Sequence, residues 1–551
     1  MKFPKKTNLM LILFLIALSF VLRFPSTPHS MGIDAFVMQN LANTMAHDGF
    51  AAWIMHPLSF LGLYPLSYPS GGIFLTANVI VLTDTSSEVS IMLLSFMMGL
   101  IGVLGSYMLA REFRDDDLFA FIVAFLFCLA PKFILNTTWE TPTRGGFMAF
   151  TPIFLWSLLR AHRDSSRKNI ALPILFLFIL ATFHRLALLM LIVILAYISA
   201  YFFFVLVKIA KMKMPAVFLR PKARKRMRLF GVIALLALAA GLVFGSGVLD
   251  SYETGRVISS DEIQVELFNL GVSLTRSSGV LAPFLLVGAV VLAYQRNKTL
   301  KESFILFVVL AIIPTLYLRR YTGFYVPVFL SLLAGMGVIG IMMVARKRKR
   351  ATVAVFIAIL VGSLGLTGML LDYESESSKY MSMEEYGTGL YASQYVNGTI
   401  FSNNGLLVTR ISAVSGLPYL PIGGATVARS GPEQLAFGFV DVEDIHVTQI
   451  PLEELTLNSD HPFLAYGVPS AQREWRAIHD GFVDDLETYP DTDRHLREYN
   501  IYYVLEDSKL PYHFMWSGPI RYSRFLGDRD YGVHNVRYKM YESERNQIWS
   551  L

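Results

Sequence analysis

Long apolar segments recur along the first two thirds of this sequence. Each approaches the roughly 20 residues that a helix needs to cross a bilayer. The apolar run over 170–207 is too long for one helix, and we divide it at Phe183, His184 and Arg185. The pattern predicts eleven transmembrane helices, at about 8–22, 90–110, 118–133, 146–160, 170–183, 186–207, 229–248, 279–294, 303–318, 322–344 and 351–371.

The polar loops between these segments predict their orientation. The stretch KIAKMKMPAVFLRPKARKRMR carries nine Lys and Arg and ARKRKR carries five, whereas residues 31–89 carry none. Basic loops stay on the cytoplasmic side of a membrane. We therefore expect a multi-pass protein of the cell membrane with a cytoplasmic N-terminus. The segment after the first helix has no small-x-small cleavage site, so we expect that helix to be retained.

The pattern changes after residue 371. Residues 1–371 hold 34 Lys and Arg against 16 Asp and Glu, whereas residues 372–551 hold 14 against 26. An odd number of spans places this acidic part outside the cell. EYNIYYVLED is typical of a helix end, a buried strand and a charged stop, and RYKMYESERNQIWSL of two short strands around a turn. We predict a transmembrane domain over 1–371, with an outer loop at 31–89, and an extracytoplasmic mixed α/β domain over 372–551.

Composition narrows the class of function. The net charge of +6 reflects the basic inner loops, so it does not indicate nucleic-acid binding. The single Cys128 excludes an intramolecular disulfide. The sequence contains no phosphate-binding Walker motif, no zinc pattern, no dinucleotide-binding GxGxxG after a strand and no GxSxG.

Two acidic residues are candidates for chemistry. Asp34 follows the first helix in MGIDAF, and Glu140 lies in the short outer loop NTTWETPTRGGF. Acids that converge from two loops can bind a divalent ion such as Mg²⁺ or Mn²⁺, or share acid and base work. The alternatives are that Asp34 is a solvated loop acid or a helix N-cap, and that Glu140 forms a local ion pair with Arg144.

Several basic residues lie at outer helix ends, where the positive-inside rule makes them unusual. Arginine binds phosphate through its planar fork, so these residues can hold a lipid-linked phosphate. The alternative is that they anchor to lipid headgroups. The candidates are Arg319 and Arg320 in LRRYTGFYVP, His184 and Arg185, and Arg144.

The order of these features resembles the GT-C superfamily of membrane glycosyltransferases, and within it the archaeal-type catalytic subunits of oligosaccharyltransferases. Four parts of the chain carry the resemblance: GIDAFVMQNLANTMAHDGFAAWIMHPLSFLGLYPLSYPSGG, LAREFRDDDLFAFIVAFLFCLAPKFILNTTWETPTRGGF, LRRYTGFYVPVFLSLLAGMGV, and the basic inner loop before the last helix and the outer domain.

The chain also departs from those subunits. It lacks their Trp-Trp-Asp-Tyr-Gly motif, because Trp475, Trp516 and Trp549 are not adjacent to one another. We predict eleven helices where the family usually has thirteen, and the first outer loop offers one Asp rather than paired acids. These departures favour a related glycosyltransferase that is distinct from enzymes acting on a sequon asparagine.

The resemblance implies a donor sugar on a polyprenyl phosphate or diphosphate, such as that of dolichol, within membrane lipid, and a protein or glycan acceptor. It implies an inverting transfer with Asp34 as the base, Glu140 as the second acid, and Arg319 or Arg320 at the leaving phosphate. Aromatic side chains for the sugar would be Trp53, Tyr64, Tyr68 and Trp139.

Two other functions fit the same sequence. A transporter would bury ionisable groups near the bilayer centre, often in repeated halves, whereas these acids lie in loops and no repeat is visible. A membrane scaffold or sensor whose outer domain binds a partner is the second alternative.

Overall fold

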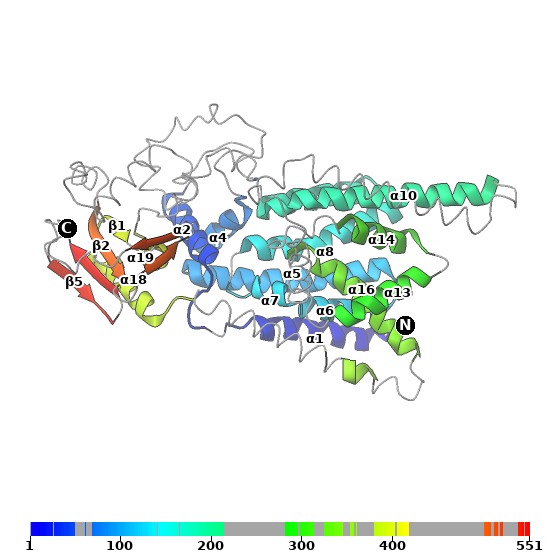
Figure 1. Cartoon of the computed structure of the whole chain (residues 1–551), viewed down its shortest axis with the longest axis horizontal. Coiled ribbons are helices and arrows are strands. Elements are labelled where there is room, and N and C mark those ends of the chain that lie inside the picture. Colours follow the sequence, from blue (N-terminus) through cyan, green and yellow to red (C-terminus); the bar gives the residue numbers. More distant parts are fainter. Residues whose placement is uncertain are drawn as a thin grey trace, which may run out of the picture. The chain divides into compact units, whose positions relative to one another are not determined.

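The computed structural model describes residues 2–25, 27–49, 61, 69–139, 142–164, 166–213, 281–295, 298–312, 324–344, 353–357, 360, 380–402, 405–417, 501–507, 512–515, 518–521, 538–544 and 546–550 (Figure 1). The chain forms two compact units. The first unit comprises Met1–Phe24, Ser95–Thr138 and Arg144–Ser375, and the second comprises Pro25–Leu94, Trp139–Thr143 and Glu376–Leu551.

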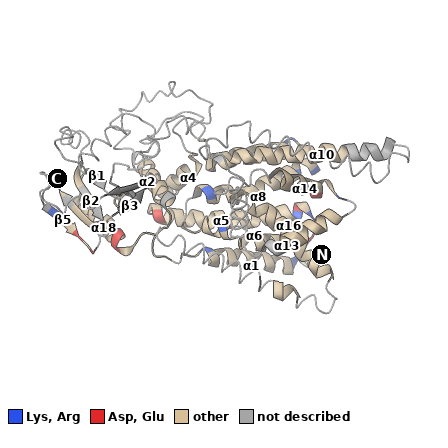
Figure 2. Cartoon of the chain, viewed as in Figure 1, with Lys and Arg blue, Asp and Glu red and all other residues tan. Residues whose placement is uncertain are grey.

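The described residues of the first unit form helices and the turns that connect them. Its elements are α1 (Lys5–Arg23), most of α5 (Ser87–Phe113), α6 (Asp117–Cys128), α7 (Pro131–Leu135), α8 (Pro142–Arg163), α9 (Arg167–Phe183), the 3₁₀ turn η1 (Arg185–Leu188), α10 (Leu189–Lys213), α13 (Leu281–Tyr294), α14 (Leu300–Ile312) and α16 (Pro327–Val344). Figure 2 shows few charged residues along these helices.

Within the described residues, four helical segments are long and apolar enough to cross a membrane: Lys5–Arg23, Ser87–Phe113, Leu186–Val205 and Pro327–Val344. Each coincides with a predicted span, and α6, α8, α9, α13 and α14 match further ones. The span predicted at 229–248 and most of the one at 351–371 lie outside the described residues. The structure is therefore that of a mostly helical multi-pass protein, and the number eleven stays a prediction.

The division of 170–207 at Phe183 is confirmed. Helix α9 ends at Phe183, and His184 has an extended backbone with φ −156° and ψ 143°. Its Nδ1 accepts a hydrogen bond of 3.1 Å from the amide of Leu186, which opens the 3₁₀ turn. This side chain supplies the acceptor that a new helical turn needs at its start.

The acids of the loop REFRDDD contact basic groups and backbone amides of the first unit. Asp115 lies 2.7 Å from the ammonium group of Lys2. Asp117 pairs with Arg111 and accepts a 2.7 Å hydrogen bond from the amide of Phe3. Asp115 and Asp117 therefore hold Lys2 and Phe3 against the end of α5.

The second unit contains a four-stranded sheet. Its strands are β1 (Thr399–Ser402), β2 (Ile501–Asp507), β5 (Tyr538–Glu542) and β6 (Asn546–Ser550), in the order β1-β2-β6-β5. Only the β1–β2 pair is parallel among these. Strands β3 (Tyr512–Met515) and β4 (Gly518–Arg521) form a separate antiparallel pair. The strand expected in EYNIYYVLED and the two expected in RYKMYESERNQIWSL are observed as β2, β5 and β6.

Helices α18 (Met383–Tyr395) and α19 (Gly405–Ser415) pack on this sheet. The shared core is apolar and comprises Ala392, Val396, Ile400, Leu407, Val408, Ile411, Leu505 and Ile548. The same unit contains α2 (Ile33–Asp48) and α4 (Gly71–Thr83), both from segment 31–89, which the sequence predicts to lie outside. Figure 1 shows α2 between α19 and α4. The boundary at 371 stays a prediction, because residues 361–379 lie outside the described part.

Candidate functional site

Asp34 lies in the first turn of α2. The helix begins at Ile33 after Gly32, whose φ of 90° favours glycine. It ends at Asp48 and is followed by Gly49 in the left-handed region. Gly32 therefore takes the N-cap position, so the alternative that Asp34 is the N-cap is wrong. The side chain of Asp34 lies outside the described residues.

Two faces of α2 are packed. Met38, Leu41 and Ala42 form a core with Ile73 and Ala77 of α4. The other face contacts α19, where Asn40 Nδ2 donates to the carbonyl of Thr409 at 3.1 Å. A helix fixed on two sides gives its first turn, and hence the backbone of Asp34, a defined position.

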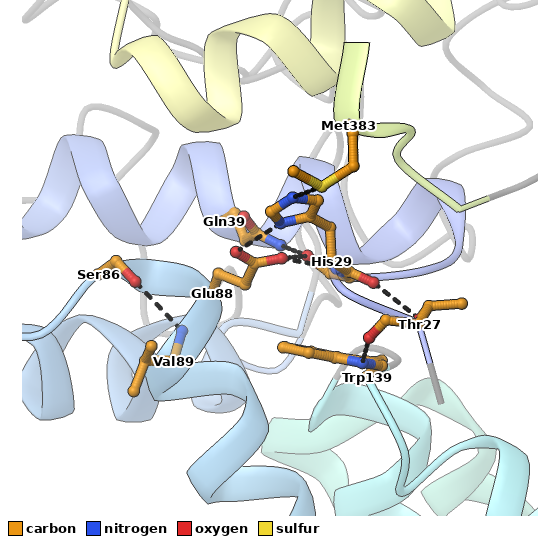
Figure 3. Close-up of polar contacts among 9 residues, drawn as sticks. Thr27, His29, Gln39, Ser86, Glu88, Val89, Trp139 and Met383 are labelled. Atoms are coloured by element: carbon orange, nitrogen blue, oxygen red, sulfur yellow. Dashed lines mark hydrogen bonds and ion pairs between the residues drawn. The ribbon is translucent and has the colours of Figure 1, made fainter. Parts of the chain in front are cut away.

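The segment that leads into α2 is held by Glu88, in the first turn of α5 (Figure 3). The Glu88 carboxylate accepts hydrogen bonds from the amide of Ser30 at 2.6 Å and from its hydroxyl at 3.2 Å. His29 Nδ1 lies 3.4 Å from the second carboxylate oxygen. Gln39 Nε2 donates to Ser30 Oγ at 2.6 Å, which ties the same point to α2 itself.

His29 also joins this segment to α18. Its Nε2 lies 3.2 Å from the sulfur of Met383 (Figure 3). Its ring stacks on that of Tyr386 with centroids 4.0 Å apart. The amide of Met381 donates to the carbonyl of Ser30 at 3.2 Å. Segments 350 residues apart in sequence thus form one structure around the start of α2.

The loop that leads to Glu140 is buried. Asn136, Thr137 and Thr138 have at most 9% of their surface exposed. Trp139 has a positive φ of 58°, which is uncommon for a residue other than glycine, and its indole N–H donates to the carbonyl of Thr27 at 3.2 Å. Glu140 itself lies outside the described residues, so its pairing with Asp34 or Arg144 stays a prediction.

The basic candidates are described in part. Arg144 is half-buried, and its guanidinium carbon lies 5.3 Å from the ring centroid of Phe324. His184 is buried and opens the 3₁₀ turn through its ring nitrogen. The side chains of Arg185, Arg319 and Arg320 lie outside the described residues, as do Trp53, Tyr64 and Tyr68.

Arg23 is a buried residue that the sequence analysis did not single out. It has 1% of its surface exposed at the end of α1. Its Nε donates to Thr137 Oγ1 at 2.7 Å and its Nη1 to the carbonyl of Ser19 at 3.2 Å. The guanidinium lies 4.7 Å from the ring centroid of Phe133. Its place at a helix end that the sequence predicts to be outer is the same signal that identified Arg319, and it could have identified Arg23.

A metal site is not visible in the described part of the chain, which holds no group of three or more His, Cys, Asp and Glu side chains. The predicted Mg²⁺ or Mn²⁺ ligands, Asp34 and Glu140, have side chains outside that part. Their fit to a cation therefore stays a prediction.

Comparison with known proteins gives similarity in structure only. No protein-family model matches the chain, and no curated protein matches its sequence. An oligosaccharyltransferase of Archaeoglobus fulgidus, tethered to an acceptor peptide containing an NVT sequon, matches with a TM-score of 0.57 and 14% identity over 93% of this chain and 70% of that one. The A. fulgidus oligosaccharyltransferase AglB, in complex with an inhibitory peptide and a dolichol-phosphate, matches with a TM-score of 0.53 and 14% identity. The match covers 92% of this chain and 70% of that one.

A second protein matches over nearly its whole length. ArnT of Cupriavidus metallidurans, bound to undecaprenyl phosphate, gives a TM-score of 0.54 and 12% identity over 100% of this chain and 98% of that one. At these identities the similarity establishes the fold.

Proposed function

This chain has the fold of the GT-C membrane glycosyltransferases, and we propose that it transfers a sugar from a polyprenyl-phosphate-linked donor to an acceptor on the outer face of the membrane. The observation that carries the proposal is the similarity over at least 92% of the chain to two kinds of protein, one in complex with a dolichol-phosphate and the other with undecaprenyl phosphate. The proposal includes a cytoplasmic N-terminus, with residues 372–551 outside, and a protein or glycan acceptor.

The proposed reaction inverts the anomeric carbon. An acceptor hydroxyl or amide attacks that carbon, the bond from the carbon to the phosphate oxygen breaks, and the phosphate leaves on its lipid. Asp34 takes the acceptor proton, with Glu140 as the second acid. Arg319 and Arg320, with Arg144, His184 and Arg185, would stabilise the negative charge on the departing phosphate.

The remaining roles are binding roles. Trp53, Tyr64, Tyr68 and Trp139 would offer aromatic surface to the sugar. A Mg²⁺ or Mn²⁺ ion at Asp34 and Glu140 would supply Lewis-acid stabilisation of the phosphate when bound. The two-sided packing of α2 supports the role of Asp34, because a catalytic group must be held in a defined geometry.

The test is consumption of a lipid-linked sugar. We would reconstitute the protein with lipid extract from its native host and an acceptor-containing membrane fraction, and follow lipid-linked sugars by mass spectrometry. Asp34→Asn is compared with Asp84→Asn, a matched control at an exposed position after α4. We expect wild type and Asp84→Asn to consume one polyprenyl-phosphate sugar, and Asp34→Asn to consume none.

Each other outcome has a definite meaning. Equal consumption by Asp34→Asn would remove Asp34 from the mechanism and leave the class of reaction standing. Loss of wild-type activity with a chelator would support the metal. If folded wild type consumes no lipid-linked sugar, the transferase proposal fails, and the transporter and scaffold functions lead.

A further inference from the structure

Helix α2 presents two asparagines to α19 at helical spacing. Asn40 Nδ2 donates to the carbonyl of Thr409 at 3.1 Å, and Asn43 Nδ2 donates to the carbonyl of Ala413 at 3.2 Å. Residues three or four apart lie on one face of a helix. The two hydrogen bonds therefore run between one face of α2 and successive turns of α19, and they fix the register of one helix against the other.

The second of these bonds completes the end of α19. Ala413 lies in the last turn, where helix carbonyls have no partner within the helix. The amide of Gly416 bonds to Ser412, and that of Leu417 to the hydroxyl of Ser415. Asn43 thus supplies a donor to a carbonyl that α19 leaves open, and an apolar side chain at position 43 would supply none.

The first turn of α2 is held at the same interface. Phe36, two residues after Asp34, is fully buried in a cluster with Met381 and Ala413. The guanidinium carbon of Arg410 lies 5.6 Å from the centroid of the Phe36 ring. The contacts of α19 therefore extend along α2 from Asn43 to the turn that contains Asp34.

We propose that Asn40 and Asn43 are positioning residues, through which α19 sets the place of Asp34 in the reaction. This inference rests on the proposed function of Asp34. Helix α19 would then influence turnover without touching the substrate, because it fixes the position of α2, which carries the base. A misplacement of about 1 Å at a reacting group can lower turnover by about 100-fold.

The test uses the full-length reconstituted protein with Asn40→Asp and Asn43→Asp. Aspartate keeps the size of asparagine and removes its N–H donors. Asn78→Asp is the matched control, because Asn78 is exposed and its Nδ2 donates within α4, to the carbonyl of Phe74. Turnover, KM for the lipid-linked donor, and hydrogen exchange of the backbone amides are measured for each variant.

We expect turnover to fall by about 10-fold to 100-fold in both variants, while KM for the donor changes by less than about 2-fold. Amides of α2 should exchange faster, and those of β2 and β6 should exchange as in wild type, which shows that the fold is kept. Asn78→Asp should change none of these values.

Three outcomes would overturn this inference, and they are distinguishable from one another. Wild-type turnover in both variants, with or without faster exchange in α2, would overturn the positioning role and leave the proposed function intact. Faster exchange in β2 and β6 together with α2 would overturn it too, since the asparagines would then support the whole unit. Wild type that consumes no donor would overturn the proposed function and this inference with it.

Discussion

The buried ion pair between Glu385 and Arg410 gives the sharpest stability prediction. Their side chains are 3% and 6% exposed, and Glu385 Oε1 lies 2.8 Å from Arg410 Nη1. Glu385 also closes a capping box at the start of α18. Its Oε2 accepts from the amide of Ser382 at 2.9 Å, and its own amide donates to Ser382 Oγ at 3.1 Å.

Glu385→Ala removes the carboxylate and leaves the guanidinium buried. Removing one partner of a buried pair costs about 3–5 kcal/mol. Loss of half of the capping box adds roughly 0.5–1 kcal/mol. We therefore expect the free energy of unfolding of the second unit to fall by about 4 kcal/mol, a large part of the roughly 5–15 kcal/mol that stabilises a domain.

A double-mutant cycle separates the pair from the cap. Arg410→Met alone leaves a buried carboxylate, and we expect the free energy of unfolding to fall by about 3 kcal/mol. The double variant buries neither charge, so we expect a loss smaller than the sum of the two single losses by about 2 kcal/mol or more.

The assay is hydrogen exchange of the amides of α18, β1 and β2 in detergent, which reports the opening free energy of this unit. Two single losses that simply add, to within about 0.5 kcal/mol, would refute the reasoning, because independent sites behave in that way.

Two further predictions concern the first unit. In Gly99→Ala, the added Cβ would overlap Arg23 Nε and Cδ, which cannot move because the side chain is buried. We expect the free energy of unfolding to fall by roughly 1–3 kcal/mol, measured by thermal unfolding. Gly387→Ala, in α18 with open space around it, is the control and should be neutral or stabilising. The hydrogen bond and charge of Lys2 hold the pKa of Asp115 below its ordinary 3.8, so this pair contributes stability above that pH and loses it as the pH falls. Lys2→Ala should raise the pKa of Asp115 in an NMR titration, and an unchanged titration would contradict the assignment.

Local patterns in the sequence predicted the parts of the fold that local forces determine. The break after Phe183 was visible because a polar pair interrupts an apolar run, and the structure shows that His184 opens the next turn. Strands β2, β5 and β6 were visible because aromatic and β-branched residues are bounded by charged or turn residues. In such segments, the residues within the helix or strand are enough to determine which element forms.

Features that depend on distant residues could not be predicted in this way. Nothing near Asn43 indicates that its partner is the carbonyl of Ala413, 370 positions later. Arg23 was passed over because its partner Thr137 follows by 114 positions. The N-cap alternative for Asp34 is wrong because Gly32, two positions earlier, is the N-cap of a helix that begins at Ile33. Gly32 takes this position because its backbone can adopt a φ of 90°. The similarity to GT-C glycosyltransferases, expected from the order of motifs, is confirmed at the level of the fold.

Strand β6 has a consequence for how the protein is made. It lies between β2 and β5, so the sheet cannot close until residues 546–550 have been synthesised. Helix α2 ends at Asp48, roughly 500 residues earlier. At about 5–20 residues per second, α2 leaves the ribosome on the order of 25–100 s before the sheet beside its partner α19 is complete. Until residues 405–415 have been synthesised, the asparagine face of α2 has no α19 to bind, and a chaperone that reaches α2 would find its substrate there.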